Sequence, residues 1–251
     1  MPLTIIEANP TFKRVVDKNI PQLKVAEMFA RTIQGESVST GVPSTFLRLK
    51  DCTLDCVYCD SSSVWRYGNP YSIETILDLL EENKVVEDFK NGHHLILTGG
   101  SPLLQQKSLV ILINRFKERF GFKPYVEVEN ECTLEPSLDF IELVDQWNNS
   151  PKLANSMMKM KVRYKSDLLI KMSNLPNSWF KFVVNYFTDW DEIEQLFLPY
   201  MKREQIVLMP AGSSRQELKI TREIAIDLAI KKNVRFSERE HIVVWDKKTG
   251  V

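Results

Sequence analysis

The segment STFLRLKDCTLDCVYCD, residues 44–60, joins an apolar stretch to three closely spaced cysteines. The pattern of residues 44–49 predicts a strand, and Cys52, Cys56 and Cys59 follow it with Cys-x3-Cys-x2-Cys spacing. In α/β folds with parallel sheets, chemistry gathers at the carboxyl ends of the strands. The segment therefore predicts both a strand of such a sheet and a site directly after it.

The rest of the chain alternates between short apolar runs and helix-like stretches. The predicted strands are 44–49, 94–100, 125–130, 179–184, 205–210 and 241–245, and the predicted helices are 72–89, 109–120, 137–147, one from about Asp191, and 216–231. This alternation is typical of βα units around a parallel sheet. Strands of about this number predict an α/β fold built as a partial, TIM-like βα barrel of about six parallel strands, not a full eightfold barrel. We expect a single domain over residues 1–251, with residues 1–22 as an N-terminal leader.

Composition excludes several classes of protein. The chain has 251 residues, 43% of them hydrophobic, and 33 basic side chains balance 33 acidic ones. A balanced chain has no global attraction to nucleic acid or to an anionic membrane surface. The sequence contains no signal-peptide pattern and no run of about eighteen apolar residues. We therefore expect a cytoplasmic protein, with neither nucleic acid nor membrane as partner, in which clustered cysteines bind metal or act in redox chemistry.

The cysteine spacing leaves two kinds of metal site open. Three thiolates can hold three corners of a 4Fe–4S cluster and leave one iron free for a small molecule, whereas a cluster that only transfers electrons takes four cysteines. Structural zinc needs four ligands. The histidines His93, His94 and His241 lie far away in sequence, although folding could bring one of them near. The fourth cysteine, Cys132, is expected to be a small core residue.

Tyr58, directly before the last cysteine, completes a signature that resembles the radical S-adenosylmethionine enzymes. Longer stretches resemble one family of them, the 7-carboxy-7-deazaguanine synthases of the queuosine pathway. The matching stretches are FARTIQGES (29–37), TGVPSTFLRLKDC (40–52), CDSSSVW (59–65), LTGGSPLLQ (97–105), VEVENECT (126–133), SPKL (150–153), MPAG (209–212) and HIVVWDKKTGV (241–251).

The resemblance implies a lyase that contracts a ring. Its members convert 6-carboxy-5,6,7,8-tetrahydropterin to 7-carboxy-7-deazaguanine with loss of ammonia. It implies a 4Fe–4S cluster on Cys52, Cys56 and Cys59, S-adenosylmethionine chelated to the open iron through its amino and carboxylate groups, and Mg²⁺. It also implies a flavodoxin-like reductant and a homodimer.

Substrate-binding residues follow from the resemblance as well. They are Ile33, Gln34, Gly35, Arg48, Thr98, His241 and Val251. Gln34 can offer donors and acceptors to a pterin edge, and the guanidinium of Arg48 matches a carboxylate. From the residues alone, a polar surface turn and a surface ion pair remain open for these two. The terminal carboxylate of Val251, after a permissive Gly250, is expected to help bind substrate, the alternative being a tail that only packs.

The resemblance assigns a further set of residues to S-adenosylmethionine. These are Tyr58, Cys59, Asp60, Gly100, Ser101, Ser150, Pro151, Lys152, Met209, Pro210, Ala211 and Gly212. The ammonium of Lys152 can reach a carboxylate or ribose oxygens. Ser61 stands where the family usually has a threonine whose hydroxyl binds Mg²⁺.

Ser101 departs from the family pattern Gly-Gly-Glu-Pro, whose glutamate helps to hold the methionine amino group. A serine hydroxyl accepts hydrogen bonds but brings no negative charge. Glu127 and Glu129, which alternate on one face of the next strand, are candidates to replace it. The alternative is that these two residues are solvated carboxylates with no such role.

Two other functions remain as alternatives. One is a radical S-adenosylmethionine activase of a glycyl-radical enzyme or ribonucleotide reductase, which would act on a protein. The other is a zinc-stabilised binding module, which would not be an enzyme.

Overall fold

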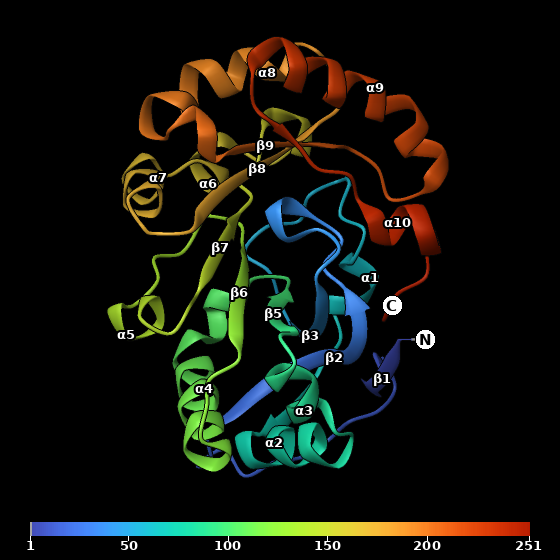
Figure 1. The fold of residues 1–251 in the computed structure, drawn as a ribbon, viewed down its shortest axis with the longest axis vertical. Helices are drawn as coiled ribbons and strands as arrows, with labels where there is room; N and C mark the ends of the chain where they lie inside the picture. The colour runs from blue at the N-terminus through green and yellow to red at the C-terminus, as the bar shows by residue number, and fades with distance from the viewer. Residues whose placement is uncertain (1) are drawn as a thin grey trace.

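The computed structural model describes residues 2–251 and shows one ten-stranded mixed sheet surrounded by helices (Figure 1). The strands are β1 (Leu3–Ile6), β2 (Gln22–Ile33), β3 (Pro43–Leu49), β4 (Asn69–Ser72), β5 (His94–Gly99), β6 (Tyr125–Asn130), β7 (Gln146–Asn149), β8 (Ser178–Val184), β9 (Ile206–Pro210) and β10 (Arg235–Phe236). The helices are α1 (Ser62–Trp65), α2 (Ile73–Glu82), α3 (Val85–Lys90), α4 (Gln106–Phe120), α5 (Leu138–Ile141), α6 (Met160–Arg163), α7 (Ser166–Ser173), α8 (Asp189–Glu192), α9 (Arg215–Lys232) and α10 (Glu240–Trp245).

The sheet order is β1-β2-β3-β5-β6-β7-β8-β9-β10, with β4 paired to β2. From β3 to β10 every neighbouring pair is parallel, whereas β1, β2 and β4 pair in antiparallel fashion at one edge. Within residues 2–251 the path ends at β1 and β10 without closing. The prediction of a partial barrel with about six parallel strands is confirmed, since six strands of four to seven residues and the two-residue β10 run parallel.

Helix patterns in the sequence account for the outer layer. In α4 the buried residues Leu109, Leu112, Ile113 and Phe116 recur at helical spacing and face the sheet. The predicted helix over 72–89 begins as expected, with the Ser72 hydroxyl accepting from the Thr75 amide. It breaks into α2 and α3 because Lys84 takes a left-handed conformation with φ of 60°. In Figure 1, α8 and α9 lie at the β8–β9 end, and α2, α3 and α4 lie at the opposite end.

Two predicted elements were wrong. Residues 146–147 were assigned to a helix over 137–147, but the helix ends at Ile141 and residues 146–149 form β7. Residues 241–245 were assigned to a strand, but they form most of the helix α10. All four residues of β7 are buried although three of them are amides, so the strand has no apolar pattern. The two errors offset each other in the strand count.

The two ends of the chain lie close together beside β1 (Figure 1). A Cβ placed on Gly250 would lie 3.5 Å from Glu27 Oε2 and 4.0 Å from Thr4 Oγ1. Residues 1–22 thus contribute the edge strand β1, and the division of the chain into a leader and a single domain stays a prediction. Over residues 2–251, the helices are all too short or too polar to cross a bilayer.

Candidate active site

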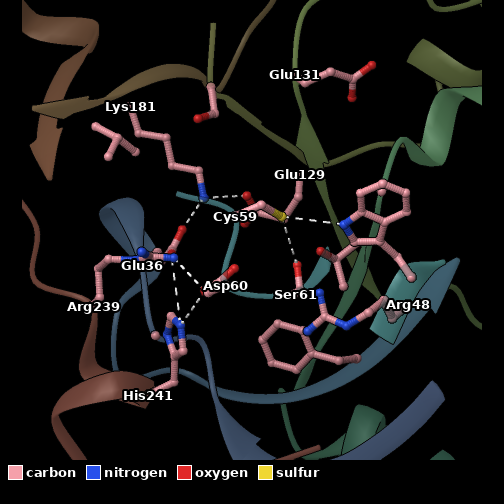
Figure 2. Close-up of a pocket in the computed structure, with 18 of the residues that line it drawn as sticks. Glu36, Arg48, Cys59, Asp60, Ser61, Glu129, Glu131, Lys181, Arg239 and His241 are labelled. Carbon is pink, nitrogen blue, oxygen red and sulfur yellow. Dashed lines mark hydrogen bonds and ion pairs between the residues drawn. The ribbon is translucent and has the colours of Figure 1, made fainter. Parts of the chain in front are cut away.

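A cavity opens at the carboxyl ends of the parallel strands, where the sequence predicted a site (Figure 2). The predicted residues that line it are Ile33, Gln34, Gly35, Arg48, Cys52, Cys56, Tyr58, Cys59, Asp60, Ser61, Thr98, Gly100, Ser150, Lys152, Met209, His241 and Val251. The structure therefore brings residues from both ends of the chain to one place.

The three clustered cysteines lie together on the loop after β3. All three are free thiols that are partly exposed to the cavity. The indole Nε1 of Trp65 donates to Cys59 Sγ at 3.4 Å, and the Leu54 amide donates to Cys52 Sγ at 3.4 Å. Hydrogen bonds to cysteine sulfur are a feature of iron–sulfur sites, where they tune the reduction potential. The donor set fits a cluster held by three thiolates.

The rival zinc site lacks its fourth ligand in this arrangement. Among residues 2–251, His241 is the histidine that lines the cavity. Its Nε2 lies 3.3 Å from Asp60 Oδ2, and so faces a carboxylate and not a thiol. Cys132, as predicted, is fully buried, and burial raises the pKa of its thiol.

The glycines after β5 are required by the chain itself. A Cβ on Gly99, where φ is 147°, would lie 2.4 Å from the carbonyl oxygen of Leu49. A Cβ on Gly100 would lie 2.1 Å from the carbonyl oxygen of Asp51 and 2.7 Å from Cys52 Cβ. The turn therefore packs directly under the cysteine loop, a close approach that only glycine allows.

Ser101 lies beneath the cysteine loop and does not line the cavity. It is fully buried, with its Oγ 3.5 Å from Cys52 Sγ and accepting from the Thr53 amide at 3.1 Å. The Thr53 hydroxyl lies 3.1 Å from Ser101 Oγ and donates to Glu131 Oε1 at 3.0 Å. Ser101 thus supports the loop, and a carboxylate from the end of β6 follows it in the same hydrogen-bond network.

Arg48, at the end of β3, forms a buried ion pair with Glu27 of β2. Arg48 Nε donates to Glu27 Oε1 at 2.7 Å. Burial would lower the pKa of the guanidinium, but Glu27 outweighs that effect and raises it. Among residues 2–251, no protein acceptor binds the two Nη atoms. This leaves the paired N–H groups of Arg48 available on the cavity wall.

Lys181, in the middle of β8, lies between two carboxylates (Figure 2). Its ammonium donates to Glu36 at 2.6 Å and also pairs with Glu129. Burial would raise the pKa of Glu36, but Lys181 and Arg239 outweigh it and hold that pKa well below its ordinary value. Burial dominates at Glu129 instead, with Glu36 adding to it, and raises the pKa above the ordinary value despite Lys181.

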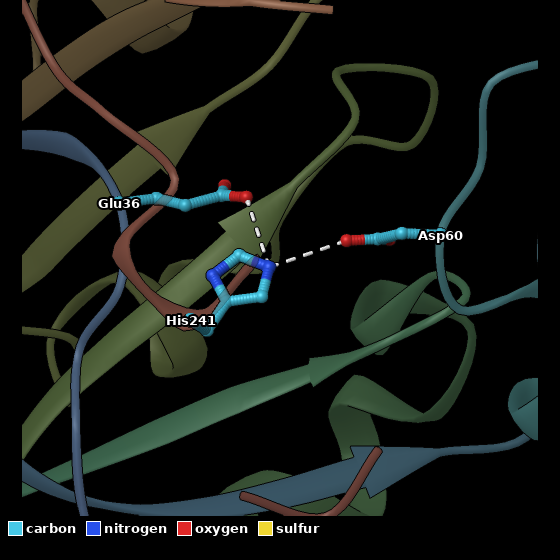
Figure 3. A group of neighbouring side chains, drawn as sticks. All are labelled: Glu36, Asp60 and His241. Atoms are coloured by element: carbon cyan, nitrogen blue, oxygen red, sulfur yellow. Dashed lines mark hydrogen bonds and ion pairs between the residues drawn. The ribbon is translucent and has the colours of Figure 1, made fainter. Parts of the chain in front are cut away.

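Glu36, Asp60 and His241 converge in a second polar group (Figure 3). Such a set of oxygen and nitrogen atoms can bind a metal ion, but here Arg239 neutralises it. The guanidinium donates to Glu36 Oε1 at 3.0 Å and to Asp60 Oδ2 at 2.5 Å. Burial would raise the pKa of Asp60, and Arg239 with His241 lowers it far below its ordinary value. A Cβ on Gly35 would lie 2.4 Å from His241 Nδ1, so this glycine is needed for the approach of α10.

Gln34 is more deeply engaged by protein groups than the sequence predicted. Its Nε2 donates to Glu129 Oε1 at 3.1 Å and to Glu127 Oε2 at 3.4 Å, and its Oε1 accepts from the Glu36 amide at 3.3 Å. Glu127 lies behind the cavity and accepts further hydrogen bonds from Ser39, Gln146, Asn148 and His94. The side chain of Gln34 therefore positions two glutamates.

The remaining predicted residues lie beside the cysteine loop. Lys152 Nζ donates to Ser150 Oγ at 2.7 Å. Tyr58 packs on Val183, Met209 and Ala211, which gives an apolar shelf. Four further predicted residues, Pro151, Pro210, Ala211 and Gly212, do not line the cavity, and the carbonyl of Gly212 accepts from Arg239.

Four charged residues of the cavity were missed by the sequence analysis. They are Glu36, Glu131, Lys181 and Arg239. Lys181 carries the clearest signal, because it is the one charged residue in the apolar run WFKFVV. An unpaired lysine inside a buried strand is costly, so such a residue indicates a partner or a function.

Comparisons with known proteins identify the superfamily and the family. The Radical SAM superfamily model matches residues 48–155. The 7-carboxy-7-deazaguanine synthase of Pyrobaculum aerophilum is 31% identical over 92% of this chain and 98% of its own length. The corresponding protein of Halobacterium salinarum is 28% identical over 90% and 91%. The crystal structure of QueE from Escherichia coli has the same fold, with a TM-score of 0.62 and 20% identity over 88% of this chain and 95% of that one. With such identity across nearly the whole of the Pyrobaculum relative, the chain belongs to the 7-carboxy-7-deazaguanine synthase family of the radical SAM superfamily.

Proposed function

We propose that this chain is a radical S-adenosylmethionine lyase that converts 6-carboxy-5,6,7,8-tetrahydropterin to 7-carboxy-7-deazaguanine with loss of ammonia. One observation carries the proposal: a single cavity is lined both by three free cysteines and by charged, hydrogen-bonding side chains, among them Arg48 with its two Nη atoms unpaired within residues 2–251. The relatives named 7-carboxy-7-deazaguanine synthase support the choice of reaction. The activase alternative has no comparable support.

The cysteine wall is the place for the cofactors. Cys52, Cys56 and Cys59 would hold a 4Fe–4S cluster, which together with S-adenosylmethionine would supply radical chemistry at this wall. Lys152, which shares a hydrogen bond with Ser150, binds a carboxylate or ribose oxygen of S-adenosylmethionine. The apolar shelf under Tyr58 and Met209 accepts a flat base.

Another wall of the cavity binds the pterin. The two free Nη atoms of Arg48 form a fork that matches the substrate carboxylate. Thr98 is the register partner of Arg48 on β5 and adds a hydroxyl next to it. Ile33 and the terminal carboxylate of Val251 complete this wall, and the carboxylate accepts from the donor edge of the pterin.

Ser61 is the proposed Mg²⁺ ligand. Its hydroxyl lies 3.8 Å from Cys59 Sγ and has no other side-chain partner among residues 2–251. It therefore remains available to a cation that also binds substrate oxygens. Asp60 is less suited, because Arg239 already occupies its carboxylate.

An anaerobic assay tests the proposal. The reconstituted chain is incubated with 6-carboxy-5,6,7,8-tetrahydropterin, S-adenosylmethionine, Mg²⁺ and a chemical reductant. We expect 7-carboxy-7-deazaguanine and ammonia in equal amounts. A brown protein that cleaves S-adenosylmethionine but leaves the pterin intact overturns the substrate, and a colourless zinc protein overturns the reaction class.

The expected partners belong to the same proposal. A flavodoxin-like protein acts as the physiological electron donor, the chain forms a homodimer, and it works in the cytoplasm. Replacing the chemical reductant by reduced flavodoxin and measuring the mass in solution by light scattering test the first two.

A further inference from the structure

Among residues 2–251, Glu131 is the acidic side chain of the cavity that lacks a cation. Glu36 and Glu129 pair with Lys181, and Glu27 pairs with Arg48. Within residues 2–251, Glu131 forms no ion pair with lysine, arginine or histidine, although it lines the cavity and is only 6% exposed. A buried carboxylate is costly unless donors satisfy it.

One of the two oxygens of the Glu131 carboxylate already accepts hydrogen bonds from the protein. Glu131 Oε1 accepts from the hydroxyl of Thr53 at 3.0 Å and from that of Thr133 at 2.7 Å. Its other oxygen, Oε2, is buried and has no hydrogen-bond partner in the structure. The two threonines therefore fix the orientation of Glu131, and one acceptor remains for a donor that comes from a ligand.

The position of Glu131 relates it to the cysteine loop. Thr53, which holds Oε1, directly follows Cys52, and the Ser101 hydroxyl contacts both Thr53 and Cys52. Ser101 itself is fully buried, uncharged and outside the cavity lining, so it cannot offer a carboxylate to a ligand. Glu131 lies in the same network and, unlike Ser101, is one of the residues that line the cavity.

We propose that Oε2 of Glu131 accepts a hydrogen bond from the α-amino group of S-adenosylmethionine, and so supplies the negative charge that is missing at Ser101. The inference deepens the proposed function and rests on it, since it assumes S-adenosylmethionine as co-substrate. Neither Glu127 nor Glu129 takes this role, because Glu127 lies behind the cavity and Glu129 is paired with Lys181.

Binding measurements on the reconstituted protein test the inference without turnover. Two ligands are compared by anaerobic calorimetry: S-adenosylhomocysteine and its desamino analogue, which differ only in the α-amino group. We expect Glu131→Gln to weaken S-adenosylhomocysteine binding on the order of tenfold to a hundredfold, the range for a hydrogen bond to a charged group. Affinity for the desamino analogue should stay within about twofold.

Control variants separate binding from folding. Glu142→Gln changes an exposed glutamate outside the site and should leave both affinities unchanged. Glu131→Asp keeps the negative charge but places it one methylene farther from the ligand. This variant should lose an intermediate amount of affinity for S-adenosylhomocysteine and none for the desamino analogue. Iron and sulfide content must match the parent protein in every variant. Equal losses for both ligands, or no loss for either, overturn the inference. A third outcome is that Glu131→Gln weakens only S-adenosylhomocysteine binding while the parent protein does not convert the pterin. That outcome would overturn the proposed substrate but not this inference.

Discussion

Glu27 and Arg48 face each other across β2 and β3, and the carboxylate binds only the Nε side of the guanidinium. The pair is buried, so Arg48 is held in one orientation with its Nη atoms toward the cavity. An unpaired arginine would be free to turn away. In the role proposed for Arg48, this buried partner would orient the fork before the substrate carboxylate arrives.

Arg48→Lys should impair pterin binding selectively. Lysine keeps the charge but offers a single point donor, which cannot bind Glu27 and a substrate carboxylate side by side. We expect the KM for the pterin to rise about tenfold to a hundredfold. Steady-state kinetics check this, with Arg115→Lys on the exposed face of α4 as the matched control. An unchanged KM would exclude Arg48 as the carboxylate ligand.

Moving the carboxylate from position 131 to position 101 should recover part of the binding that either single change loses. Ser101→Glu alone adds a second carboxylate to a fully buried position beside Cys52 and Glu131, and should weaken S-adenosylmethionine binding. In the double variant Ser101→Glu with Glu131→Gln, one carboxylate remains, and affinity should recover by about tenfold over Glu131→Gln. Calorimetry on reconstituted proteins decides it. A double variant no better than the worse single one would contradict the exchange.

Three of the four cysteines should be required to bind the cluster, and the fourth should not. Cys52→Ala, Cys56→Ala and Cys59→Ala should each lose the cluster, whereas Cys132→Ala should retain full iron and sulfide at a stability cost of about 1–2 kcal/mol from its buried position. Iron and sulfide analysis after reconstitution measures this. Cluster loss in Cys132→Ala with retention in Cys56→Ala would reverse the assignment.

Extending the chain beyond Val251 should raise the KM for the pterin. Val251 lines the cavity, and added residues would remove its terminal carboxylate from this position. We compare a protein with a few additional C-terminal residues with one that carries the same residues at its N-terminus. Cluster content and S-adenosylhomocysteine affinity should not change. Normal pterin kinetics in the extended protein would show that the tail only packs.

Glu127 should make the free energy of unfolding depend on pH in the acidic range. Burial would raise the pKa of this carboxyl, but His94, Ser39 and other donors hold it below its ordinary value of 4.5. A lowered pKa stabilises the folded state fully above pH 4.5, and this contribution disappears as the pH falls through the lower folded-state pKa.

Urea unfolding of the cluster-free chain at several pH values measures the effect. Glu127→Gln should lower the free energy of unfolding by about 2 kcal/mol at pH 7, and the gap to the parent should shrink below pH 4.5. Exposed Glu118→Gln serves as control. A gap that stays constant down to pH 3 would contradict the assignment.

The sequence by itself determined the class of fold and the metal-binding loop. Strand and helix patterns such as residues 94–99 and α4 are local, because burial of one face leaves a periodic trace in the chain. The spacing of Cys52, Cys56 and Cys59 is equally local, since one loop carries all three thiols. The burial of polar residues leaves no such periodic pattern, and the buried amides of β7 could not be predicted for this reason. The short apolar run 241–245 fits a strand as well as a helix, and it forms most of the helix α10.

Only the tertiary structure decided which charges meet. Lys181 is paired with Glu36 across 145 positions of sequence, and Glu131 reaches Thr53 across 78. Such pairs depend on which strand ends become neighbours in the sheet, which no local pattern encodes. The same reason explains why Glu129 has a cation and Glu131 has none: strand alternation places carboxylates on a face, but the packing of β8 decides that Glu129 meets Lys181.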